Sequence, residues 1–226
     1  MFNNLLTEID GRGARAIAPG LIPPAATRNG HSESVTMFKP ICARLPRCKK
    51  ENLEPVIELA VEIAREGREG RRIGTLFTFG DADAVLARSR PLILDPFAGH
   101  PRESRNVRDP NLRGTVKELA QLDGAFVVSN AGFVVSACRY LDALASDVAL
   151  PFGLGSRHVA GASISAVTNA VAIVVSESAM VRIFDNGGLI AEIIPELWLL
   201  SHHHVQLRGP YIEERQGDMA VRVHAS

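Results

Sequence analysis

The stretch from residue 170 to residue 194 constrains the fold most, because it holds three short apolar segments separated by polar turns. The segments are "AVAIVVS", "MVRIF" and "LIAEII", and "DNGG" joins the last two. Asn-Gly between two apolar runs is a strong signal for a tight β-hairpin turn. We therefore predict three successive strands here, the last two of which form an antiparallel hairpin.

A second hairpin is predicted upstream, where "NAG" separates the apolar runs "GAFVVS" and "FVVSAC". "IGTLFTFG" has the composition of a further buried strand. Helices are predicted over residues 51–67, directly after Asp81, over residues 110–122 behind the cap Asp109, and over residues 155–168. Helices interleaved with tight hairpins predict an α/β fold, a mixed β-sheet flanked by helices, rather than a purely parallel sheet.

One compact domain is predicted over residues 49–200 of the 226-residue chain. Residues 1–48 are rich in Pro, Gly and small polar residues and show no period, which is typical of a poorly ordered extension. Residues 201–226 are interpreted as a C-terminal tail. Within it, His202–His204 do not predict a metal site, because consecutive side chains cannot all point to one side.

The composition excludes several classes of protein. Formal net charge is zero, so no overall basic field predicts nucleic-acid binding. No apolar run approaches the roughly 20 residues that a membrane-spanning helix needs. The three cysteines fit no zinc spacing and, without a signal peptide, predict free thiols in a reducing compartment. We expect a cytoplasmic protein with no membrane or nucleic-acid partner.

Asp123 stands between the end of a predicted helix and the start of a strand, followed by Gly124 and Ala125. An acid at the mouth of a strand, without bulky neighbours, can hold a metal or a sugar hydroxyl while the backbone approaches a ligand. The alternative, and the commoner case, is that Asp-Gly forms an ordinary helix-to-strand turn.

The sequence "GSRH" opens a helix of small residues, and the first turn of a helix suits phosphate because its N–H groups are free. Ser156 is expected to cap that helix, and Arg157 to bind phosphate oxygens with its forked cation. His158 would pair with phosphate, order the site or assist proton transfer. Ser176 and Glu177 end a strand at the edge where α/β sheets bind ligands. Surface side chains and a solvated strand end are the alternatives.

In combination, "LDGA", "GSRH", the helix of small residues and "AVAIVVSE" resemble the diadenylate cyclase domain, the nucleotide-binding domain of DisA-type proteins. That family carries Asp-Gly-Ala and Arg-His-Arg motifs in this order and at this spacing. The resemblance covers roughly residues 51–195 and includes "EIAREGREGRRIGTLFTFGD" and "SRPLILDPFAGHP".

The resemblance implies an enzyme, a nucleotidyltransferase that condenses two ATP molecules into the second messenger cyclic di-AMP and releases two pyrophosphates, with Mg or Mn as cofactor. It implies that each domain holds one ATP and that two domains meet face to face as a homodimer; a higher homo-oligomer is left open. A two-fold symmetric product suits a two-fold symmetric interface.

The same resemblance assigns roles to individual residues. It makes Asp123, Arg157 and His158 catalytic, and it places the metal on Asp123 and Glu177. The backbone of Leu141 would read the adenine. The residues expected to bind ATP are Gly124, Ala125, Leu141, Ser156, Arg157, His158 and Ser176.

The chain departs from the family pattern at three positions, and charges are therefore expected to be missing near the phosphates. Val159 replaces the second Arg of Arg-His-Arg, and Ala166 and Asn169 stand where many members have acids. Arg182, on the strand "MVRIF", is the nearest candidate by strand order for the missing cation. Two alternatives to a cyclase remain: a non-catalytic module that binds or senses ATP or cyclic di-AMP, and an oligomerisation domain with a vestigial pocket.

Overall fold

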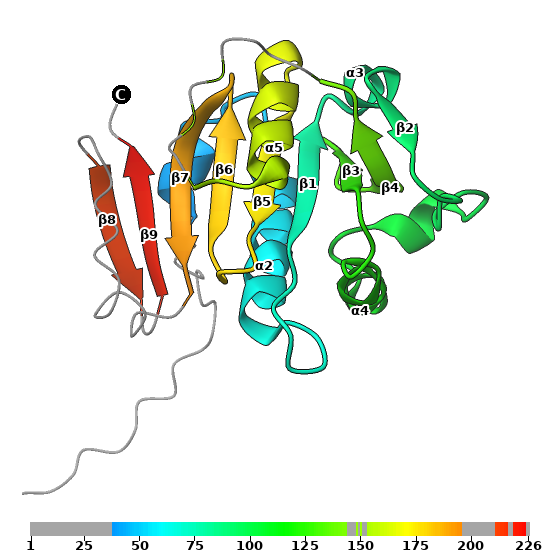
Figure 1. Ribbon diagram of the computed structural model, residues 1–226, viewed down its shortest axis with the longest axis horizontal. Coiled ribbons are helices and arrows are strands. Elements are labelled where there is room, and N and C mark those ends of the chain that lie inside the picture. The colour runs from blue at the N-terminus through cyan, green and yellow to red at the C-terminus, as the bar shows by residue number, and fades with distance from the viewer. Residues whose placement is uncertain are drawn as a thin grey trace, which may run out of the picture. The chain divides into compact units, whose positions relative to one another are not determined.

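The computed structural model describes residues 38–143, 148, 150, 153–195, 211–216 and 219–224 (Figure 1). Most of the predicted N-terminal extension and His202–His204 lie outside these residues. So does "ELWLL" after Pro195, for which the sequence predicts a short helix. Within the described ranges, no helix has the length and apolar character required to cross a membrane.

Nine strands in the described part of the chain form one sheet, in the order β2-β4-β3-β1-β5-β6-β7-β9-β8 (Figure 1). Only β1 and β3 run parallel among these strands, and the other neighbouring pairs are antiparallel. The strands are β1 (Thr75–Gly80), β2 (Ser89–Pro91), β3 (Ala125–Ser129), β4 (Val134–Leu141), β5 (Val171–Val175), β6 (Val181–Asp185), β7 (Gly188–Ile194), β8 (Tyr211–Gln216) and β9 (Met219–His224). The predicted mixed sheet and both hairpins are confirmed.

Helices cover both faces of this sheet. In Figure 1, α5 (Ser156–Val167) crosses in front of the strands and α2 (Lys50–Glu66) lies behind them. Alternate side chains of β5 show the same division, because Ile173 packs in one core cluster with α2 while Val174 packs in another with α5. The other helices are α1 (Lys39–Ala43), α3 (Ala82–Ala87), the 3-10 helix η1 (Arg102–Arg105) and α4 (Pro110–Leu119).

The small residues of α5 allow this helix to lie close to the sheet. A Cβ atom at Gly161 would lie 2.8 Å from Cγ2 of Val174 and 3.3 Å from Cδ1 of Leu76. Any larger residue at position 161 would therefore push the helix away from β5 and β1. The close packing fixes the start of α5 relative to the ends of these strands, where the predicted site residues lie.

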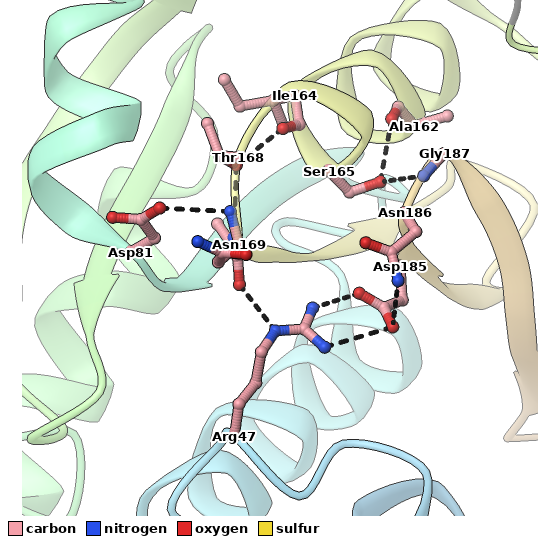
Figure 2. Close-up of polar contacts among 11 residues, drawn as sticks. Arg47, Asp81, Ala162, Ile164, Ser165, Thr168, Asn169, Asp185, Asn186 and Gly187 are labelled. Atoms are coloured by element: carbon pink, nitrogen blue, oxygen red, sulfur yellow. Dashed lines mark hydrogen bonds and ion pairs between the residues drawn. The ribbon is translucent and has the colours of Figure 1, made fainter.

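Residues 38–48 differ from the expectation of a poorly ordered extension. Ile41 and Leu45 are fully buried in the main core cluster. Figure 2 shows Arg47 donating from Nε to the backbone carbonyl of Asn169 at 2.9 Å and pairing with Asp185. The compact fold thus includes residues before 49. Two prolines interrupt the apolar side chains of this segment, so no helical period is visible in the sequence.

The predicted C-terminal tail also contains ordered strands. Residues 211–216 and 219–224 form β8 and β9, and β9 continues the sheet by pairing with β7. The alternation in "MAVRVH" is typical of a strand. Its pairing with β7 could not be predicted, because β8 and a long connection separate the two strands in the sequence.

Candidate functional site

Two adjoining cavities open where α5 begins, beside the end of β5 and the starts of β1 and β3. The first cavity contains Asp123, Gly124, Ala125 and Leu141 in its lining, and the second contains His158, Ser176 and Glu177. Ser156 and Arg157 line both. The structure therefore brings together all the residues that the sequence singled out for a site.

The sizes of the cavities indicate what they could hold. Their volumes are about 180 Å³ and 340 Å³. The first alone is smaller than the roughly 300 Å³ at which small-molecule pockets begin. A ligand as large as a nucleotide would have to occupy both cavities and pass over Ser156 and Arg157, which they share.

Arg157 lies between two carboxylates, one just before β3 and one just after β5. Its Nη1 is 3.2 Å from Oε1 of Glu177, and its Nη2 is 3.9 Å from Oδ1 of Asp123. The side chains of Asp123 and Glu177 are 81% and 69% exposed. Exposed ion pairs contribute little to stability. A ligand can therefore replace these contacts at a small cost in free energy. The guanidinium would then bind an anion, and the two carboxylates would bind a cation.

Gly74 makes room for this arrangement and was missed by the sequence reasoning. A Cβ atom at Gly74 would lie 2.6 Å from Nη1 of Arg157 and 3.3 Å from Cγ of Glu177. The glycine precedes β1, so its absent side chain leaves the space that the guanidinium fills. A glycine just before a strand is too common to have indicated this function.

Gly124 is required by packing, whereas Asp123 is not. Gly124 has a φ of 102°, and a Cβ atom there would lie 2.6 Å from the backbone carbon of Cys138 on β4. The turn explanation therefore accounts for the glycine. Oδ1 of Asp123 accepts a hydrogen bond from the backbone N–H of Gly124 at 2.9 Å, and the rest of the carboxylate faces solvent at the cavity.

The start of α5 differs from the prediction in one detail. The N-cap residue is Gly155, which has no side chain to cap the helix, and Ser156 is the first helical residue. The expected capping role of Ser156 is therefore wrong. Its side chain belongs instead to the lining of both cavities, next to the N-terminal turn whose dipole favours anions.

His158 makes its hydrogen bond inside the protein rather than at the cavity mouth. Its Nε2 is 3.1 Å from Nη1 of Arg182, and Nε of Arg182 donates to Oε1 of Glu192 at 2.6 Å. Burial, followed by the positive charge of Arg182, lowers the pKa of His158 from its usual value to about 4. His158 is therefore neutral near pH 7 and adds no charge to an anion site there.

The first cavity has an apolar wall that the sequence reasoning missed in part. Leu141 is buried at the end of β4, while the neighbouring Tyr140 is half exposed and also lines the cavity. The guanidinium carbon of Arg90 lies 4.5 Å from the centre of the Tyr140 ring. Leu92 completes this wall. An aromatic ring beside a strand end is a common surface for a flat heterocycle.

The residues present fit a divalent cation only together with a ligand. No group of three or more His, Cys, Asp and Glu side chains gathers anywhere in the described ranges. Asp123 and Glu177 supply two carboxylates on either side of Arg157. Mg²⁺ is commonly held by one or two carboxylates, with phosphate oxygens and waters completing its shell.

Two of the three departures from the family pattern lie away from this site. Asn169 is beyond the other end of α5, where its backbone N–H donates to Oδ2 of Asp81 at 3.1 Å (Figure 2). Ala166 lies in the last turn of α5, about 15 Å from Ser156 at 1.5 Å per residue. Only Val159, which is 46% exposed in the first turns of α5, removes a charge beside the cavities.

The comparison with protein families agrees with the motifs. The family described as "DisA bacterial checkpoint controller nucleotide-binding" matches residues 62–189. The chain belongs to this family. The DisA-type segment includes every predicted site residue together with Gly74 and Arg182, whereas Glu192 lies just beyond it.

Curated relatives of the DisA-type segment carry one name. A diadenylate cyclase of Methanocaldococcus jannaschii is 45% identical over 171 residues, which are 75% of this chain and 54% of the relative. A diadenylate cyclase of Haloferax volcanii is 46% identical over 147 residues, which are 65% of this chain and 54% of the relative. The chain spans about half the length of the curated relatives it matches.

Two solved structures are similar at lower identity. DacA from Staphylococcus aureus is 20% identical, with a TM-score of 0.42, and the match covers 62% of this chain and 84% of that one. A hypothetical membrane spanning protein from Bacillus cereus is 22% identical, with a TM-score of 0.46, and the match covers 66% and 67%.

Proposed function

We propose that this protein is a diadenylate cyclase, a nucleotidyltransferase that makes cyclic di-AMP from two molecules of ATP. The observation that carries the proposal is the position of Arg157 between Asp123 and Glu177 at the start of α5, in a chain of the DisA-type family. One cation flanked by two exposed carboxylates is suited to a triphosphate and its metal.

The reaction needs positioning more than covalent help from the protein. In each of two steps, a ribose 3′-oxygen forms a bond to the α-phosphorus of the other nucleotide. The bond from that phosphorus to the bridging oxygen breaks, and pyrophosphate leaves with the electron pair. Asp123, open at the cavity, orients the hydroxyl and favours loss of its proton. Arg157 neutralises charge on the phosphate that is attacked.

The two cavities divide the nucleotide between them in this proposal. The adenine lies in the first cavity, against Ala125, the backbone of Leu141 and the ring of Tyr140. The phosphates lie in the second, near the hydroxyls of Ser156 and Ser176 and the N–H groups of the first turn of α5. Gly124 allows the backbone of the Asp-Gly turn to face the ribose.

Asp123 and Glu177 are the residues proposed to hold Mg or Mn. When bound, the ion supplies positive charge to the triphosphate oxygens and to the attacking hydroxyl. His158 is assigned an ordering role, because its low pKa leaves it uncharged at neutral pH. As each protomer holds one ATP, the product requires two chains face to face. A cytoplasmic location would give such an enzyme access to ATP.

The test is incubation with ATP and either Mg or Mn, followed by mass spectrometry for cyclic di-AMP and an assay for pyrophosphate. Asp123→Asn keeps the shape of the side chain but removes the charge, so turnover should fall by about a hundredfold or more. The matched control is Asp83→Asn, which changes an exposed carboxylate on α3 and should leave the rate unchanged.

Two outcomes would contradict parts of the proposal. An unchanged rate in Asp123→Asn would remove Asp123 from the mechanism. Binding of ATP without any cyclic di-AMP, in wild-type protein with either metal, would identify a nucleotide-binding or sensing module instead. The exposed valine at position 159 is the feature that gives this second candidate its weight.

A further inference from the structure

We infer that Arg182 is a second phosphate-binding cation of this site, held in place by Glu192 and His158, and that it supplies the charge that Val159 cannot. The inference rests on the proposed function and deepens it. It concerns a residue on β6 and its partner on β7, neither of which belongs to the motifs at the start of α5.

Arg182 is buried, yet it lines the second cavity. Its exposed fraction is 9%, and the same cavity is lined by Ser156, Arg157 and Ser176. Removing a guanidinium from water is costly unless it is paired and hydrogen-bonded. The fold meets this cost with Glu192, which is only 2% exposed and accepts a 2.6 Å hydrogen bond from Nε of Arg182.

The hydrogen bonds of Arg182 leave part of its donor capacity unused. A guanidinium has five N–H donors. One is given to Glu192, one to Nε2 of His158 at 3.1 Å, and one to the sulfur of Met180 at 3.4 Å, which is a weak acceptor. The remaining donors have no partner among the described residues. A phosphate in the cavity would supply the missing acceptors.

The hydrogen bond between His158 and Arg182 determines which ring nitrogen of His158 carries the proton. Because Nε2 lies against a donor that is always charged, it must accept, and the ring proton is therefore on Nδ1. Nδ1 is buried and makes no hydrogen bond with the described residues. His158 thus orients the guanidinium without neutralising its positive charge, because the imidazole itself is uncharged. It acts on the phosphate through Arg182 and is a positioning residue.

The exposed and apolar side chain of Val159 explains why a second cation would have to come from the sheet rather than from α5. Val159 is next to His158 on α5, and its side chain is 46% exposed and carries no donor. Arg157 is shared between Glu177 and Asp123, so its charge is partly compensated before any ligand binds. Arg182 reaches the same cavity from strand β6, and the carboxylate that balances its charge, Glu192, is buried in the interior.

The test must separate a phosphate contact from a contribution to folding. Arg182→Ala alone would leave Glu192 buried and unpaired, which is strongly destabilising. The double variant Arg182→Met and Glu192→Gln removes both charges and keeps the side-chain lengths. Binding of ATP, pyrophosphate and adenosine is measured by calorimetry, and folding by cooperative thermal unfolding.

We expect the double variant to bind ATP and pyrophosphate roughly tenfold to a hundredfold more weakly, as expected for loss of a charged hydrogen bond. Adenosine, which has no phosphate, should bind as it does to wild type. Adding Val159→Arg to the double variant should restore part of the affinity for pyrophosphate. The matched control, Arg113→Met with Glu62→Gln, removes an ion pair between α4 and α2 and should leave all three affinities unchanged.

A folded double variant that binds pyrophosphate and ATP like wild type would overturn the inference. If the double variant does not fold, Arg182→Gln with Glu192→Gln decides, since it removes both charges and leaves two neutral amides that can hydrogen-bond to each other; unchanged pyrophosphate binding in this variant would also overturn the inference. Protein that binds pyrophosphate through Arg182 but makes no cyclic di-AMP would contradict the proposed function and leave the inference standing.

Discussion

A Cβ atom at Gly74 would lie 2.6 Å from Nη1 of Arg157, so the position of this guanidinium depends on a residue that has no functional group. The atom that would clash is the end of a flexible side chain, which can move away at little cost in folding energy. Movement would take Arg157 from its 3.2 Å contact with Glu177. Gly74 therefore matters for the site more than for the fold.

We predict that Gly74→Ala lowers the affinity for ATP by about tenfold, the value of one charged hydrogen bond. The free energy of unfolding should change by less than about 1 kcal/mol. The control is Gly114→Ala in α4, where a Cβ atom would meet nothing within 4 Å. It should raise the free energy of unfolding by about 1 kcal/mol and leave ATP binding as it was. Equal ATP affinity in Gly74→Ala and wild type would show that Arg157 tolerates the displacement.

How far the sequence predicted the site can be read from these residues. Asp123, Arg157 and Glu177 could be predicted because polar side chains at strand ends and helix starts are visible in the chain. Arg182 could be named as a candidate cation from strand order, but Gly74 and the buried partner Glu192 could not, because their roles depend on which strands are neighbours. Register pairs Arg182 with Glu192 across β6 and β7, and no local pattern indicates that both side chains are buried.

At the scale of elements, α5 runs between two groups of polar residues that lie at opposite ends of the strands. Its first turn lies at the candidate site. Its last turns lie at the network of Figure 2, where Oγ of Ser165 accepts from the backbone N–H of Gly187 at 3.1 Å. In the same network Asp81 accepts from Asn169, which Arg47 also contacts. Asp81 is the N-cap residue of α3, but its side chain makes no capping hydrogen bond and instead joins the end of β1 to the segment before β5.

Position 169 is therefore predicted to have no influence on turnover. Asn169→Asp restores the acid that many family members carry, but position 169 lies beyond the end of α5 that is away from both cavities. We expect kcat/KM for ATP to stay within about twofold of wild type, as for a surface change remote from the site. Val159→Arg, at the other end of the same helix, is the informative comparison and should change the affinity for ATP. A large change in kcat/KM with Asn169→Asp would mean that the two ends of α5 are coupled.

At the scale of the whole molecule, the parts of the sheet between β3 and β4 and between β6 and β7 were predictable, whereas the hairpin of β8 and β9 was missed although two residues separate its strands. The hairpins β3–β4 and β6–β7 follow from local signals, and so does the mixed character of the sheet. The parallel pairing of β1 with β3, the pairing of β1 with β5 and the addition of β9 beside β7 join segments that are distant in the chain. Burial of residues 38–48 has the same origin, because their partners are far away in sequence.

Four exposed apolar side chains line the candidate site or stand next to its residues in the sequence. Leu92 and Tyr140 line the first cavity, Leu122 directly precedes Asp123, and Val159 directly follows His158. All four are among the exposed large hydrophobic residues of the described chain. Such groups commonly mark a surface that another protein covers. A second copy of this chain, bringing its own ATP, is the partner that the proposed reaction requires.

We predict that activity depends on this association. If each protomer holds one ATP, a lone chain cannot complete the product. Below the dissociation constant of the dimer, a tenfold dilution should lower the specific activity by about tenfold, because the paired fraction falls in proportion to concentration. Mixing equal amounts of wild-type and Asp123→Asn chains should leave about half the activity of the wild-type chains, because random pairing places half of them opposite a variant. Specific activity that stays constant on dilution, in protein shown by light scattering to be monomeric, would exclude catalysis between two protomers.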